Sequence, residues 1–268
     1  MFQITIFFLY IIAGILFGLG RLPRYAAQSQ MLLFIAFVSG ITGLLWHAWT
    51  LALLILIPDG IALSIGNTAS FIGLQLALIA LIGAAESTLR GLTGGLLLLA
   101  GFIALMTSGQ TLPEPGEPMS WQIQSHILIS LFAYGLLTVG AIVALYALVQ
   151  EKRLQAGMLS SANQLFAPLE TTEKLLFGIT STGFFVLVVA VSTGFAFVEN
   201  LFAQHLVHKT ALSLLALVLF GLLLAGRRFA GWRGKRAIYL YLWGFVLLCL
   251  AYFGSRLVLE EVLGRSWS

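Results

Sequence analysis

The chain has 268 residues, of which 60% are hydrophobic and only 9% charged, and its formal net charge is +4. A soluble domain carries about 25% charged residues, so this composition excludes an ordinary water-soluble fold and predicts an integral membrane protein. The small basic excess is what the inner loops of a membrane protein supply, and it does not indicate a nucleic-acid partner.

Eight apolar segments have about the length that a helix needs to cross the hydrocarbon core of a bilayer. In chain order they are Gln3–Gly20, Met31–Ile57, Ser70–Ala85, Leu92–Met106, Ile123–Val149, Leu175–Val198, Leu206–Ala225 and Ile238–Leu259. The sequence therefore predicts an all-α bundle of about eight spans, without strands, forming a single transmembrane domain over residues 1–268. Because the third and fourth segments are short and separated only by Glu86–Gly91, six spans with a re-entrant hairpin is the alternative.

The basic residues predict the orientation. If the N-terminus lies outside, eleven of the 14 lysines and arginines fall in inner loops, where such residues are enriched. Both termini are then on the outer, periplasmic side of a bacterial inner membrane. The main inner connections are the polar stretch Gln150–Lys174 and the basic stretch Gly226–Arg236.

Four histidines, His47, His126, His205 and His208, fall in the outer half of this topology. Around His126, polar side chains recur every four residues and so share one helix face; they are Gln122, His126, Ser130 and Tyr134. A polar stripe is costly when it faces lipid, so this face is expected to line the bundle interior or a cavity.

Neutral imidazole is a good axial ligand for haem iron. We therefore expect His126 and His208 to be the iron ligands, with His47 as an alternative and no role for His205. Lys209 and Arg256 are the nearby outer cations that suit haem propionates, and Tyr134 completes the pocket. The alternative for the histidines is a hydrogen bond inside the bundle or a place at the membrane interface.

The single cysteine, Cys249, rules out a CxxCH motif, so any haem is expected to be held without covalent attachment, as haem b. No GxSxG or HExxH string occurs either, and no catalytic residue is assigned. The sequence thus predicts a binding protein and not an enzyme.

The stretch Ser125–Gly135, with the sequence SHILISLFAYG, is similar to the histidine-led helix of cytochrome c assembly proteins, the superfamily of CcsA-type and HemX-like proteins. Further matches are Ser192–Phe197, His208–Thr210, Gly226–Arg228, Gly231–Ala237 and Ala251–Gly254. The resemblance covers residues 121–259 best and is closest to the short bacterial YpjD-like branch. It implies a haem-handling protein of the inner membrane, with His126 at a haem-ligand position.

The chain also departs from that family. Complete cytochrome c synthases carry a WxWD-like segment, but Val198–Thr210 contains no tryptophan, and Leu223–Arg227 and Gly254–Leu259 lack the later histidines. The resemblance therefore implies a binder, carrier or assembly factor. The alternatives are a regulatory or scaffold protein of tetrapyrrole metabolism, which would bind a membrane partner through residues 150–174 and 226–236, and a transporter or an accessory to one.

Overall fold

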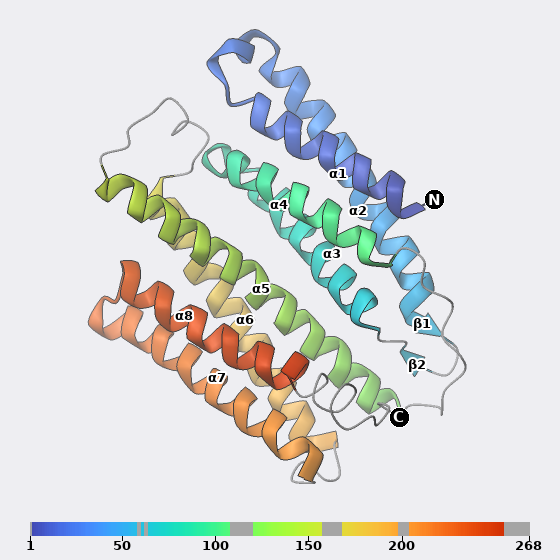
Figure 1. Ribbon diagram of the computed structural model, residues 1–268, viewed down its shortest axis with the longest axis vertical. Coiled ribbons are helices and arrows are strands. Elements are labelled where there is room, and N and C mark those ends of the chain that lie inside the picture. Colours follow the sequence, from blue (N-terminus) through green and yellow to red (C-terminus); the bar gives the residue numbers. More distant parts are fainter. Residues whose placement is uncertain are drawn as a thin grey trace. The chain divides into compact units, whose positions relative to one another are not determined.

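The computed structural model describes residues 2–57, 60–61, 64–107, 120–156, 168–197 and 204–254. Within these ranges, eight helices are long and apolar enough to cross a membrane. They are α1 (Phe2–Leu19), α2 (Ser29–Ile55), α3 (Ile65–Gly83), α4 (Arg90–Ala104), α5 (Trp121–Gln155), α6 (Leu169–Phe197), α7 (Gln204–Ala230) and α8 (Gly234–Cys249) (Figure 1). The all-α, eight-span prediction is confirmed, and eight spans are favoured over six. The fourth span, Ser87–Ala104, is α4 with the 3-10 turn before it, and the eighth, Gly234–Tyr252, is α8 with the three residues after it. The sidedness of the termini stays a prediction.

The remaining described elements are short. The 3-10 helices are η1 (Pro23–Gln28), η2 (Ser87–Leu89) and η3 (Leu105–Thr107), and α8 continues into a π-helical segment, η5 (Leu250–Gly254). Strands were not expected, but β1 (Leu56–Ile57) and β2 (Gly60–Ile61) form a two-residue antiparallel ladder directly after α2. This ladder joins α2 to α3, whose N-terminus is capped by the Ser64 hydroxyl accepting from the Asn67 amide at 3.0 Å.

The two expected inner loops are largely helical where they are described. Helix α5 continues to Gln155 and α6 begins at Leu169, while residues 157–167 lie outside the described ranges. Between α7 and α8 only residues 231–233 are not helical. The reason is that Glu, Lys, Arg and Gln are strong helix formers, so the helices continue past the apolar segments that sequence analysis used to place their ends.

The chain divides into two compact units. The first contains residues 1–124 and 150–172, and the second residues 125–149 and 173–268. In the first unit α1 packs against both α2 and α4, and α3 packs against α4. Helices α1 and α4 approach each other closely at Gly14 and Gly94. A Cβ atom built on either glycine would lie 2.8 Å from the carbonyl oxygen of the other. Small residues of this kind bring membrane helices into backbone contact.

In the second unit α5 and α7 run in one direction and α6 and α8 in the other (Figure 1). Each neighbouring pair of these helices is joined by side chains. The contacts are His126 with Thr193, Glu173 with Arg227, the ring of Phe220 with that of Tyr241, and the Tyr241 hydroxyl with the Leu137 carbonyl. The four helices therefore form a closed ring of contacts.

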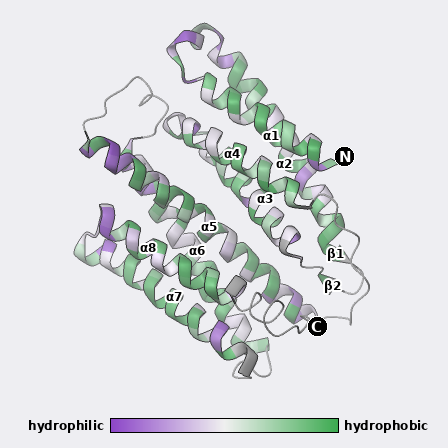
Figure 2. Ribbon diagram, viewed as in Figure 1, coloured by the Kyte–Doolittle hydropathy of each residue, from purple (hydrophilic) through white to green (hydrophobic). Residues whose placement is uncertain are grey.

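Hydropathy varies along each helix in the way that a bilayer requires. Figure 2 shows hydrophobic residues along the middle of the helices and hydrophilic residues gathered at helix ends, including the C-terminal end of α5 and the turn between α7 and α8. Polar side chains inside the spans are therefore candidates for a functional role, because a polar group is retained in hydrocarbon only where it has a partner.

We expect Gly94→Ala to destabilise the protein by roughly 1–3 kcal/mol, because the new methyl group would force α1 and α4 apart. Gly95→Ala is the matched control, since a Cβ there meets nothing within 4 Å. Thermal unfolding of the purified protein in detergent measures both. Equal midpoints for the two variants would contradict the close helix contact.

Candidate functional site

The polar stripe of α5 lies partly buried in the structure, as the sequence predicted. Its members Gln122, His126, Ser130 and Tyr134 are all half-buried. The Nδ1 atom of His126 lies 3.0 Å from the Thr193 hydroxyl of α6. That hydroxyl also lies 2.9 Å from the carbonyl oxygen of Ala190, one turn earlier in α6. His126 is thus held against α6 by a short chain of hydrogen bonds.

These contacts favour one tautomer of the neutral His126 ring. A carbonyl oxygen can only accept, and the Ala190 carbonyl lies within reach of both the Thr193 hydroxyl and the His126 ring. If Thr193 donates to this carbonyl, its oxygen accepts from His126 and Nδ1 is the protonated nitrogen. In the neutral ring Nε2 consequently keeps its lone pair, which is the group that binds a metal.

Gly194 makes this position of the imidazole possible. A Cβ at Gly194 would lie 3.0 Å from Cε1 of His126, closer than side-chain contacts normally allow. Thr193 and Gly194 therefore act together, one residue supplying the hydrogen bond and the next leaving room for the ring. In the sequence this pair belongs to a stretch that resembles the family, and nothing in its spacing connects it to His126. A small residue beside a hydroxyl residue inside a span is the signal that the sequence offers.

Tyr134 lies two turns further along the same face of α5. Its hydroxyl donates to the Leu248 carbonyl at 3.2 Å, and its ring centroid lies 5.6 Å from that of Tyr252 in η5. Ser213 of α7 is a hydrogen-bonding neighbour of the same hydroxyl. The stripe on α5 is therefore bordered by α6 at His126 and by α7 and α8 at Tyr134.

The contact between Tyr134 and Ser213 sets the level of α7 relative to α5. At about 1.5 Å per residue, His126 lies about 12 Å before Tyr134, and His208 about 7.5 Å before Ser213 in the parallel helix. The two histidines are thus about one turn apart along the bundle. Lys209 is half-buried and lies on the same face of α7 as Ser213. His208 is exposed and lies about 140° round the helix from Ser213.

His47 occupies a different kind of site, in the first unit. It is 2% exposed, and both of its ring nitrogens have partners: Tyr10 Oη lies 3.2 Å from Nδ1 and Ser70 Oγ lies 2.8 Å from Nε2. These contacts tie α2 to α1 and α3. The geometry matches the hydrogen-bonding alternative considered for the histidines, because iron binding would need one of these bonds to break.

Two proposed residues cannot be placed in full. Arg256 lies outside the described residues, as does the side chain of His205, whose backbone is in the first turn of α7. Among the residues that are described, no three His, Cys, Asp or Glu side chains gather as they would around a bare metal ion.

Comparison with known proteins shows a family match over most of the chain. Residues 35–263 match the family described as "Cytochrome C assembly protein". The chain is 32% identical over 236 residues to "Inner membrane protein YpjD" of Escherichia coli (strain K12), a match that covers 85% of this chain and 87% of that protein. It is also 32% identical over 167 residues to the "Uncharacterized 28.8 kDa protein in nifR3-like 5'region" of Azospirillum brasilense, covering 60% and 61% of the two chains. No solved structure matches the chain.

We expect His47→Ala to destabilise the protein by about 2–4 kcal/mol, because it leaves a cavity and removes the partner of two buried hydroxyl groups. His208→Ala is the control and should change stability by about 0.5 kcal/mol or less, since that side chain is exposed. Thermal unfolding in one detergent compares them. If His47→Ala unfolds at the same temperature as His208→Ala, the structural role assigned to His47 is wrong.

Proposed function

The chain belongs to the cytochrome c assembly protein family and is a multi-pass inner-membrane protein with a role of the cytochrome c biogenesis type, and from that premise we propose that it binds haem through His126. The bound group is a haem b, held without a covalent link. The protein acts as a binder, carrier or assembly factor and performs no bond-making step itself.

One observation supports this proposal: the hydrogen bonds that join His126, Thr193 and Ala190 favour the tautomer in which Nε2 is unprotonated. Histidines that bind metals typically donate their other ring N–H to a fixed acceptor, which orients the ring and strengthens the ligand. Here the acceptor comes from α6 and the histidine from α5, so the ring is oriented before any ligand arrives. Nε2 of His126 would be the protein ligand to the iron that a bound haem supplies.

The second axial ligand in this proposal is His208. Its ring is exposed and lies about 140° round α7 from the face that carries Ser213, so it would have to reach the iron of a haem bound at the outside of that face. Lys209 follows it on the half-buried side of α7, where a cation suits a propionate carboxylate. Tyr134 borders the site two turns below His126, and Arg256 stays a second candidate for the propionates.

The absence of synthase activity is also part of the proposal. Residues 198–210 carry no tryptophan, so this chain lacks the segment that presents haem in the complete synthases that it resembles. Cys249 is the only thiol and is no candidate for a haem-attachment motif. A protein of this kind holds haem for delivery, storage or sensing.

The direct test is the absorption spectrum of the purified protein after haem loading. We expect a Soret band typical of histidine-ligated haem in the natural protein, and a large loss of bound haem in the double variant His126→Ala, His208→Ala. An absent Soret band in the natural protein, or an unchanged one in the double variant, would refute haem binding at this site. Full function without any of the four histidines would favour the regulatory or scaffold role.

A second variant pair tests how His126 is oriented. Thr193→Val removes the hydroxyl group at nearly constant volume, and we expect haem affinity to fall by about 10–100-fold, the usual effect of losing such a partner. Thr193→Ser keeps the hydroxyl and should bind haem nearly as well as the natural protein. Equal affinities for the valine and serine variants would show that the hydrogen bond does not matter for ligation.

A further inference from the structure

The turn between α7 and α8 carries a cluster of cations that the proposed haem site does not use. Arg227 and Arg228 lie in the last turn of α7, Arg233 in the turn, and Lys235 and Arg236 in the first turn of α8. Because α7 and α8 are both membrane spans, all five lie within about one helical turn of the same membrane surface.

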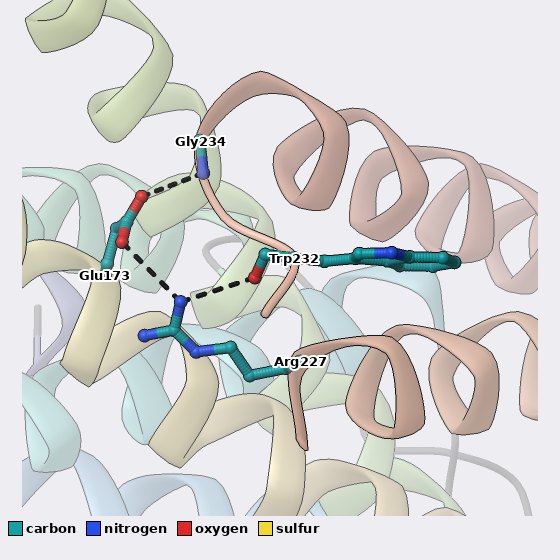
Figure 3. A network of polar contacts seen from close by, with 4 residues as sticks. All are labelled: Glu173, Arg227, Trp232 and Gly234. Carbon is teal, nitrogen blue, oxygen red and sulfur yellow. Dashed lines mark hydrogen bonds and ion pairs between the residues drawn. The ribbon is translucent and has the colours of Figure 1, made fainter. Parts of the chain in front are cut away.

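One acidic residue organises this turn. Glu173 Oε1 accepts from the Gly234 amide at 2.9 Å, and its Oε2 lies 4.0 Å from Nη1 of Arg227 (Figure 3). Arg227 also donates to the Trp232 carbonyl at 3.3 Å and lies over the Phe177 ring at 4.4 Å. Glu173 of α6 thereby neutralises Arg227 and ties the turn to the bundle.

The other arginines are not neutralised in this way. Arg228, Arg233 and Arg236 are exposed, and within the described part of the chain none of them forms an ion pair. Arg236 instead lies over the Trp232 ring, 3.9 Å from its centroid. That ring packs on Gly226, where a Cβ would collide with it, and Figure 3 shows it directed away from the network around Glu173. The fixed turn thus presents three guanidinium groups outward.

A row of large apolar side chains continues from these cations along the outside of the helices. Tyr239 and Trp243 follow Arg236 at helical spacing on one face of α8 and are 47% and 64% exposed. Phe229, beside Arg228 at the end of α7, is 86% exposed. A surface with cations at the level of the headgroups and aromatic rings on the hydrocarbon side has the polarity of a single lipid molecule.

We propose that Arg228, Arg233 and Arg236 bind the phosphodiester headgroup of an anionic membrane lipid, with its acyl chains against Tyr239 and Trp243. Arginine suits this task because its planar fork of donors matches phosphate oxygens. The apolar row favours a lipid over a free phosphate, which would use only the cations. Because Arg236 is stacked on the Trp232 ring, its guanidinium group is held in place before the headgroup binds.

The test uses the full-length protein in nanodiscs that contain phosphatidylcholine alone or a mixture with phosphatidylglycerol. Native mass spectrometry counts the lipids that remain bound after the protein is released from the nanodisc. We expect phosphatidylglycerol to be retained in preference to phosphatidylcholine. The triple variant Arg228→Gln, Arg233→Gln, Arg236→Gln should bind it roughly a hundredfold more weakly, at about fivefold for each lost cation near the surface.

Two controls keep the outcome unambiguous. The variant Arg24→Gln, Lys152→Gln, Arg153→Gln removes the same charge at other helix ends and should keep the bound lipid. The variant in which lysine replaces the three arginines of the turn keeps the charge. This variant should fold and should retain most of the preference for phosphatidylglycerol. The proposal is overturned if the natural protein retains both lipids equally. The same result is expected if the turn binds a protein partner and not a lipid. It is equally overturned if the glutamine variant loses no affinity, or if soluble glycerol phosphate displaces the lipid.

Discussion

Hydrocarbon offers no hydrogen-bonding partner, so a polar side chain inside a membrane span must find one on a neighbouring helix. In the first unit this requirement joins three helices at His47, through Tyr10 and Ser70. In the second unit it joins α5 to α6 at His126 and α5 to α8 at Tyr134. Such contacts select which helix faces meet, and small residues such as Gly14 and Gly94 then allow the backbones to approach.

The same requirement separates two histidines that look alike in the sequence. Both ring nitrogens of His47 are bonded to hydroxyl groups, so the ring serves to connect helices. At His126 the hydroxyl partner among the described residues is Thr193, and its bond to a carbonyl favours the tautomer in which the other ring nitrogen keeps a lone pair.

The two proposed sites lie at opposite ends of α7. His208 and Arg228 are 20 positions apart in one continuous helix, which is about 30 Å, or the thickness of the hydrocarbon core. Haem at one membrane surface and an anionic lipid at the other would thus contact the same helix without competing. Glu173 matters to this arrangement because it holds the lipid end of α7 against α6 and α8.

The sequence by itself determined the all-α class, the eight spans and the family, because these depend on composition, on the length of apolar runs and on local motifs such as Ser125–Gly135. It also indicated that the stripe through His126 and Tyr134 faces inward, since four-residue spacing is a local property of a helix. It placed helix ends less well, because strong helix formers continue α5 and α7 past their apolar segments. Only the tertiary structure decided the contacts of His47 and His126. Their partners lie on other helices, 23 to 67 positions away, and spacing along one helix carries no information about them.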